Sequence, residues 1–275
     1  MTPEDHRKRY RPIVGGVSVS GPWSQATGTN GMTVIDAKDQ ELAALSNDHV
    51  YGFSPGVGVV TCMQPGTADR EQFTDPTARF GTLKRVADDL SKPDPLSYAG
   101  IYVDHYVDSA IAKPDQPELL SKEILEIGVP KGVKASYLNL PVQKSGRTSG
   151  LTKGKITAEH ATVFVGYQNP MNYFYRKKMV DQILTSKMLD AGDSGSILLT
   201  EDGYVVGLGF AGSDQVSVFN RWENVERLMQ VKLPPSEVPP IPPTPPEEKL
   251  LQFSIDEGNR WEDAKTIRVR PKGAD

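Results

Sequence analysis

The chain has 275 residues, a formal net charge of −4, and ordinary shares of hydrophobic (37%) and charged (24%) residues, which predict a soluble globular protein with room for two small cores. It has no long basic run, which argues against a nucleic-acid partner, and no apolar stretch near the roughly eighteen residues of a membrane span. No signal-peptide core follows the charged start 1–9, and the single cysteine, Cys62, excludes an intramolecular disulfide, so a reducing cytoplasmic location is expected.

Short β-prone runs separated by glycine, proline and asparagine predict an all-β protein. The expected strands span 13–20, 32–35, 57–63, 155–165 and 204–210. Long amphipathic helices of the kind that connect parallel strands do not occur between these runs, which argues against a parallel α/β architecture. Shorter helical turns are expected within 83–90 and 118–127. Cys62 lies inside an apolar run, so we expect a buried strand residue there rather than a nucleophile.

The clearest helix of the sequence is predicted at 220–231. Asn220 can cap its amino terminus, and Glu223 has the spacing of a capping box. The apolar residues that share one stripe of this helix are Trp222, Val225, Leu228 and Met229.

A proline-rich segment follows this helix. Between Pro234 and Pro246 prolines occur too often for a helix or a central strand, so we expect a stiff polyproline II spacer. We assign 233–248 as a proline-rich linker, with docking to a protein partner as the alternative, and 249–275 as a carboxy-terminal tail. The tail is too small for a core of its own, so it is either disordered or added as a strand to a partner or to the globular part.

The most informative motif is Ala-Gly-Asp-Ser-Gly-Ser at 191–196. A serine nucleophile needs activation and a site for the negative charge that develops on the substrate carbonyl. Gly192 permits a sharply turned backbone, in which its amide and that of Ser194 can point at one oxyanion position. The motif therefore predicts Ser194 as a nucleophile, with an acidic surface turn as the alternative.

Among the four histidines, His49 has the context expected of a general base. It lies near the end of the run 41–50, where an apolar strand leads into a small polar turn. His6 lies in a charged segment and His160 in an alternating strand, whereas His105 belongs to a tyrosine-rich strand and is a minor competitor.

The third group of such a site is a carboxylate that fixes the tautomer of the histidine. Asp108 suits this role because small and apolar residues flank it, as they would flank a buried carboxylate. The alternatives are that Asp108 is an exposed aspartate at a strand edge, or that Asp104 takes the role.

These motifs resemble those of trypsin-like serine proteases with two β-barrels, of the type found in bacteria and plants. Chymotrypsin-like barrels use the chain order His, Asp, Ser, as in His49, Asp108 and Ser194, whereas unrelated folds with this triad use other orders. The sequence Leu-Ser-Asn-Asp-His-Val at 45–50 is similar to Leu-Ser-Asn-Asn-His-Val in those proteases.

The resemblance covers most of 12–231 and implies an all-β fold of two six-stranded antiparallel β-barrels with a carboxy-terminal helix. It implies a protease domain at 12–232, with the active site between the barrels, preceded by an amino-terminal extension at 1–11.

A second segment, Gly-Arg-Thr-Ser-Gly at 146–150, resembles a segment of bacterial members in which the arginine pairs with the aspartate that precedes the serine. Carried over, Arg147 would hold Asp193 and keep the oxyanion loop open. A surface arginine in a glycine-rich turn is the alternative.

The sequence Ile-Val-Gly-Gly at 13–16 matches the new amino terminus that animal trypsins expose on activation. Pro12 makes cleavage after Arg11 poor, and a pair between Arg147 and Asp193 would make a freed amine unnecessary. We therefore expect an ordinary first strand at 13–20.

The resulting hypothesis is a serine endopeptidase, in which His49 takes the proton of Ser194, an acyl-enzyme forms, and Asp108 orients the histidine. By resemblance, Met188 lies at the base of the primary pocket, where no acid is found, so a small to medium apolar side chain is the expected preference. The strand along which substrate backbone would pair contains Phe210, Ala211 and Gly212.

We expect neither a metal nor a cofactor for this polypeptide-cleaving chemistry. An alternative from another class is a latent or inactive protease-like module that recruits partners through its proline-rich tail. An esterase would use the same residues.

Overall fold

The computed structural model describes residues 1–22, 27–51, 59–72, 75–87, 90–169 and 173–235, and the backbone of 252–254 and 261–263. The chain divides into two compact units, Met1–Ser236 and Glu237–Asp275. In the second unit β19 (Gln252–Ser254) and β20 (Trp261–Asp263) form an antiparallel pair. The expected linker beyond residue 235 and the rest of the tail lie outside the described residues, so their predicted roles stay predictions.

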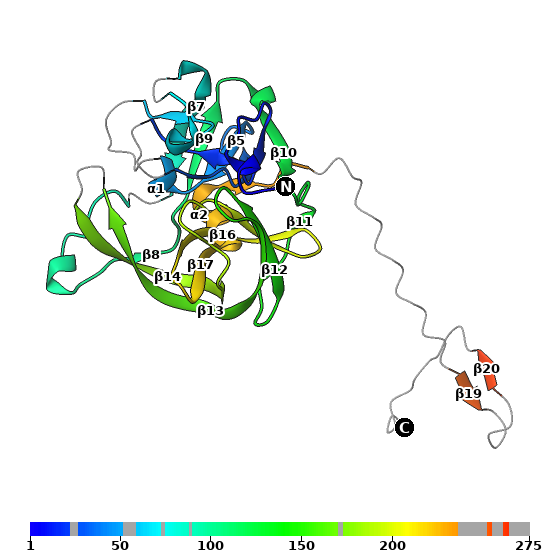
Figure 1. The fold of residues 1–275 in the computed structure, drawn as a ribbon. Coiled ribbons are helices and arrows are strands. Elements are labelled where there is room, and N and C mark those ends of the chain that lie inside the picture. Colours follow the sequence, from blue (N-terminus) through cyan, green and yellow to red (C-terminus); the bar gives the residue numbers. More distant parts are fainter. Residues whose placement is uncertain are drawn as a thin grey trace. The chain divides into compact units, whose positions relative to one another are not determined.

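The first sheet of the first unit is antiparallel and has the strand order β18-β4-β5-β9-β7-β6. Figure 1 labels its strands β5, β7 and β9. Its strands are β4 (Met32–Asp36), β5 (Leu42–Ser46), β6 (Thr61–Met63), β7 (Arg79–Val86), β9 (Ala110–Pro114) and β18 (Val231–Lys232). Two further pairs join β1 (Ile13–Gly15) to β10 (Leu120–Ile124) and β2 (Ser18–Val19) to β3 (Gly28–Thr29).

The second sheet closes into a barrel of six strands, because β16 pairs with both β15 and β17. The barrel strands are β12 (Pro141–Gly146), β13 (Gly150–Gln168), β14 (Phe174–Ser186), β15 (Ile197–Thr200), β16 (Tyr204–Gly212) and β17 (Val216–Arg221). Two short strands, β11 (Gly132–Val133) and β8 (Asp104–His105), add in parallel to β16 and β14. The predicted all-β fold of two barrels is confirmed.

Both faces of the first sheet are covered, which explains its uninterrupted apolar runs. Alternate residues of a strand face opposite sides, so Ala43 and Leu45 of β5 enter one cluster and Ala44 enters another. The first cluster also contains Leu199 of the second barrel and Trp222, so it lies between the barrels. A separate cluster fills the second barrel.

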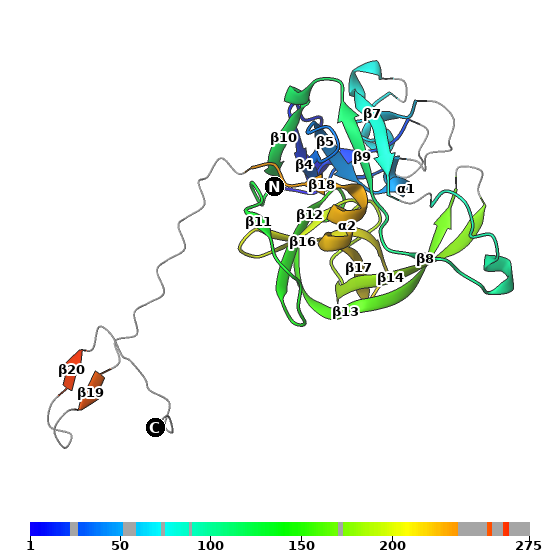
Figure 2. The same cartoon turned by 180° about the vertical axis from the view of Figure 1, so that it is seen from behind.

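The predicted helix is present as α2 (Trp222–Met229), which Figure 2 labels, and its apolar stripe packs on the cluster between the barrels. Gln230, in the left-handed region with φ 50°, ends it. The predicted cap by Asn220 is wrong, because Asn220 lies in β17 and its side chain bonds to Asp108 and Gln182.

The remaining helical elements are short. They are α1 (Asp48–Tyr51) and the 3-10 turns η1 (Asp5–Arg7), η2 (Thr67–Asp69), η3 (Pro76–Ala78), η4 (Ser97–Ala99) and η5 (Pro117–Leu119). The helical turns expected within 83–90 and 118–127 are largely wrong. Strand β7 extends to Val86, and strand β10 follows η5, because pairing with neighbouring strands overrides weak local helix propensity. No helix in the described ranges is long and apolar enough to cross a membrane.

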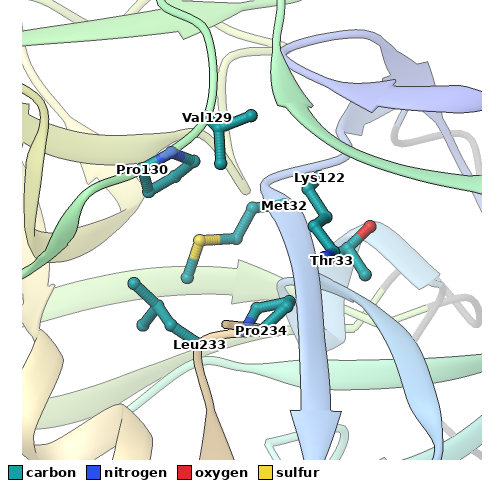
Figure 3. Close-up of a pocket in the computed structure, with 7 residues that line it drawn as sticks. All are labelled: Met32, Thr33, Lys122, Val129, Pro130, Leu233 and Pro234. Carbon is teal, nitrogen blue, oxygen red and sulfur yellow. The ribbon is translucent and has the colours of Figure 1, made fainter. Parts of the chain in front are cut away.

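A small cavity lies where the chain leaves β18 and passes over β4 (Figure 3). Met32 points into the space between Val129 and Leu233, and the cavity volume is about 10 Å³, room for about one water molecule. Lys122 Nζ donates to the Pro235 carbonyl at 3.2 Å, which fixes the chain beyond β18. This cavity is too small for a substrate side chain.

Candidate active site

Asp108 and His49 meet at the junction of α1 with the segment that leads into β9. Asp108 Oδ2 lies 2.6 Å from His49 Nδ1, so that ring nitrogen carries a proton. The Asp108 side chain is fully buried, whereas that of His49 is 18% exposed. The other carboxylate oxygen, Oδ1, accepts from the amides of Asp48 at 2.9 Å and His49 at 3.4 Å, at the start of α1.

Neighbouring strands fix the Asp108 backbone. Its amide donates to Asn220 Oδ1 at 3.1 Å, and its carbonyl accepts from Asn47 Nδ2 at 2.6 Å. Asn220 Nδ2 in turn donates to Gln182 Oε1 at 2.8 Å. Asp108 is therefore held by side chains from both barrels, as a buried carboxylate must be if it is to keep one orientation.

Ser194 lies in the turn between β14 and β15. Its hydroxyl donates to the Phe210 carbonyl at 3.3 Å. Gly192 and Gly195 flank it with φ of 101° and 98°, a region that side chains rarely adopt. Within the described residues the amides of Gly192 and Ser194 donate no hydrogen bond. The positive φ of Gly192 agrees with the sharp turn expected there, and the role of the two amides as an oxyanion site stays a prediction.

Thr29 of β3 attaches this turn to the first barrel. Its amide donates to the Ser194 carbonyl at 2.8 Å, and its hydroxyl donates to the Gly192 carbonyl at 2.9 Å. At the preceding Gly28, a Cβ would lie 2.4 Å from Val50 Cγ2 and 2.8 Å from the Ser194 carbonyl oxygen. Val50, which follows His49, therefore packs on Gly28, and the serine turn packs on the same glycine.

Asp193 has a different cation from the predicted one. Lys144 Nζ of β12 lies 3.1 Å from Asp193 Oδ2, and both side chains are fully buried. The carboxylate also accepts from the amides of Thr148 at 2.8 Å, Ser149 at 3.1 Å and Asp190 at 2.9 Å. Burial alone would raise the pKa of Asp193, but the Lys144 charge and these hydrogen bonds together lower it below 3.8.

The predicted pair of Arg147 with Asp193 is wrong. Arg147 instead makes a two-pronged contact with Asp69 of η2, with distances of 2.6 Å from Nε to Oδ2 and 2.7 Å from Nη2 to Oδ1. Ser18 Oγ donates to the same Asp69 at 2.6 Å. Arg147 lies just outside β12, so its side chain reaches across to the first barrel, while Lys144 points inward from the strand.

The residues expected in the substrate pocket belong to two parts of the second barrel. Met188 is buried in the barrel core and its amide donates to Ser217 Oγ at 2.9 Å. Phe210, Ala211 and Gly212 form the end of β16, where Ala211 and Gly212 pair with β17. Phe210 is buried and Gly212 is exposed. Their contact with substrate stays a prediction.

The competing residues lie elsewhere. His105 is buried beside Asp94, with 2.9 Å between Nε2 and Oδ1, and Asp104 pairs with Lys178 at the surface. His6 is buried between the Gly16 carbonyl and Glu126, and His160 is exposed beside Asp181. Burial raises the pKa of the Cys62 thiol, which keeps it protonated and unreactive.

The sequence reasoning missed several residues around the site. Lys144 carried a signal that depends on a strand outside those predicted from the sequence: it shares with Val142 the inward face of β12, where a lysine needs a partner. Thr29, Asn220 and Tyr167 carried none, since their roles depend on contacts between distant segments.

No protein-family model and no curated protein matches this chain. Solved structures do match. Protease A of Thermobifida fusca has a TM-score of 0.55 at 15% identity over 82% of this chain and 99% of its own. The chymotrypsin of Cellulomonas bogoriensis has 0.54 at 17% identity over 82% and 99%. The Nocardiopsis protease has 0.53 at 16% identity over 81% and 99%. This chain therefore has the two-barrel fold of the chymotrypsin-like serine proteases of bacteria.

Proposed function

We propose that this protein is a serine endopeptidase that cleaves peptide bonds through an acyl-enzyme intermediate. The observation that carries the proposal is the 2.6 Å contact between a fully buried Asp108 and a partly exposed His49. A buried carboxylate in this position holds one tautomer of the imidazole and leaves its second nitrogen as a base.

In the first step Ser194 is the nucleophile and His49 is the general base. The Ser194 hydroxyl turns from the Phe210 carbonyl toward the imidazole, gives up its proton, and attacks the substrate carbonyl. His49 then protonates the leaving amine. In the second step a water molecule, deprotonated by His49, hydrolyses the acyl-enzyme.

The amides of Gly192 and Ser194 stabilise the oxyanion in both steps. The positive φ of Gly192 and the lack of another acceptor for either amide within the described residues support this role. Each such donor stabilises the transition state by about 3–4 kcal/mol in comparable enzymes.

The support of the oxyanion turn is internal to the folded chain. The Lys144 ammonium neutralises Asp193, so no freed amino terminus is required. Ile13 fits this proposal, since it is fully buried in the core of the first barrel. We therefore propose activity without cleavage before Ile13.

For the substrate we propose a polypeptide with a small to medium apolar residue before the cleaved bond. Met188 and its apolar neighbours in the second barrel support this preference. Cleavage of a peptide library mainly after lysine or arginine would contradict it.

The decisive experiment is intact-mass detection of a fluorophosphonate adduct on the full-length protein. The native chain is expected to gain one adduct, and Ser194→Ala is expected to gain none. Ser196→Ala is the matched control, because Ser196 lies two residues away with a buried hydroxyl that has no partner within the described residues. If the native chain formed no adduct, an inactive protease-like module would be the better account.

A further inference from the structure

Tyr167 adds a third residue to the Asp108–His49 pair. Its hydroxyl donates to Asp108 Oδ2 at 3.0 Å, the same oxygen that contacts His49 Nδ1. The Tyr167 ring meets the His49 ring edge-on, with 6.1 Å between centroids and 61° between planes. Tyr167 is thus in contact with both members of the pair, and it comes from the second barrel.

Tyr167 lies near the end of β13, which pairs with β14 in a long antiparallel ribbon. Figure 1 shows the two strands. Tyr175 lies opposite Tyr167 in the register, and their rings stack with centroids 6.3 Å apart. The Tyr175 hydroxyl donates to the Leu90 carbonyl at 2.6 Å. The two tyrosines therefore share a hairpin and a stack but bond to different partners.

A buried charge cluster anchors the same hairpin to the segment that precedes Asp108. Lys177 Nζ of β14 donates to Asp94 Oδ1 at 2.6 Å, and His105 Nε2 lies 2.9 Å from the same oxygen. β8, which contains His105, pairs with β14. These contacts hold β14 against the segment that leads to Asp108.

We infer that Tyr167 is a positioning residue, whose hydroxyl fixes the Asp108 carboxylate toward His49 and sets how readily the imidazole takes up a proton. The inference rests on the proposed function, because it concerns the base of that reaction. A hydroxyl proton beside Oδ2 disperses the carboxylate charge. Its removal concentrates that charge on the oxygen facing His49, which stabilises the imidazolium.

The surroundings keep Tyr167 in its donating form. Burial, followed by the charge of Asp108 and its hydrogen bond, raises the pKa of Tyr167 well above 10. The charges of Asp48 and Tyr175 also raise the pKa of this hydroxyl. The hydroxyl therefore remains a donor throughout the pH range in which the reaction would be measured.

The test compares Tyr167→Phe with Tyr175→Phe in the full-length chain. Both changes remove one hydroxyl from the same aromatic stack, but only the first touches Asp108. The rate of fluorophosphonate labelling is measured against pH. We expect the acid limb of the pH profile of the labelling rate to move to higher pH by about 0.5–1 unit in Tyr167→Phe and to stay in place in Tyr175→Phe. An unmoved limb in Tyr167→Phe, or equal shifts in both variants, would overturn the inference.

A second readout separates this inference from the proposed function. If Ser194 of the native chain were not labelled, the proposed function would fail, but the contact would still be testable by proton NMR. The His49 Nδ1 proton should give a resonance that moves in Tyr167→Phe and not in Tyr175→Phe. A resonance that is unchanged in both variants would reject the positioning role.

Discussion

Lys144 and Asp193 form an ion pair in which both side chains are fully shielded from solvent, with 3.1 Å between Nζ and Oδ2. The lysine also donates to the Gly150 carbonyl at 3.0 Å, and the aspartate accepts from three backbone amides. This pair joins β12 to the turn that carries Ser194. Its removal should therefore affect stability and serine reactivity together.

We expect Lys144→Met to lower the free energy of unfolding by about 3–5 kcal/mol, because it leaves the Asp193 charge buried without its cation. The serine turn should also rearrange, so fluorophosphonate labelling should fall by at least about tenfold. Urea denaturation and labelling rates measure the two effects. The control is Lys134→Met, which removes a surface pair with Asp202 and should cost about 1 kcal/mol or less. Similar losses in both variants would contradict the role of Lys144.

Asp193 should make the fold sensitive to acid. Its pKa in the folded state lies below the ordinary 3.8, because Lys144 and several hydrogen bonds outweigh the effect of burial. A carboxyl with a lowered pKa stabilises the fold above its unfolded pKa, and this contribution is lost as the pH falls through the folded value. We expect the free energy of unfolding to decline as the pH falls from about 5 into the acid range, with a shallower decline in Asp193→Asn. Equal slopes of the free energy of unfolding against pH in the native chain and in Asp193→Asn would exclude Asp193 as a source of the acid sensitivity.

Gly192 should tolerate no side chain. A Cβ there would lie 2.3 Å from Thr148 Oγ1 and 2.7 Å from Arg147 Nη1, and its φ of 101° strains any other residue. We expect Gly192→Ala to cost about 1–3 kcal/mol of stability and to slow labelling of Ser194, because the backbone turn must shift. Gly166→Ala is the control, since a Cβ there meets nothing within 4 Å. Native labelling in Gly192→Ala would show that the turn does not depend on this geometry.

The partner of Arg147 can be identified by a double-mutant cycle measured by urea denaturation. Arg147→Met and Asp69→Asn should show a coupling energy of about 1–3 kcal/mol, since the two side chains make a two-pronged contact. The cycle of Arg147→Met with Asp193→Asn should show a much smaller coupling. Arg147→Lys should not restore the stability lost in Arg147→Met, because lysine lacks the planar fork. A larger coupling of Arg147 with Asp193 than with Asp69 would favour the pairing expected from the sequence.

The sequence predicted those parts of the site that depend on local motifs. The turn around Ser194 and the strand end before His49 each have a recognisable sequence, and the structure brings Asp108 to His49. The cation for Asp193 could not be chosen in this way. Lys144 and Arg147 are three residues apart, so the sequence does not show which of them pairs with Asp193. In the structure Arg147 pairs with Asp69 on the distant 3-10 turn η2, and Lys144 pairs with Asp193.

The predicted helix cap at Asn220 is wrong for a related reason. Asn220 has the residue type and spacing of a local cap, but its side chain bonds to Asp108 and Gln182, far away in the chain. Local signals compete with contacts of this kind, and a single sequence does not reveal the contacts. Tyr167 is a similar case, because its place depends on the register of a hairpin rather than on its neighbours.

The edge strand β18 has a consequence for the order in which the barrels can form. Val231 and Lys232 pair with Ile35 and Asp36, so the first sheet receives its last strand only after the whole second barrel has been synthesised. Domains often fold in turn as they leave the ribosome, but here the first sheet stays incomplete until the second barrel has been made. The two barrels should therefore unfold in a single cooperative transition, and hydrogen exchange should protect β4 and α2 to the same degree.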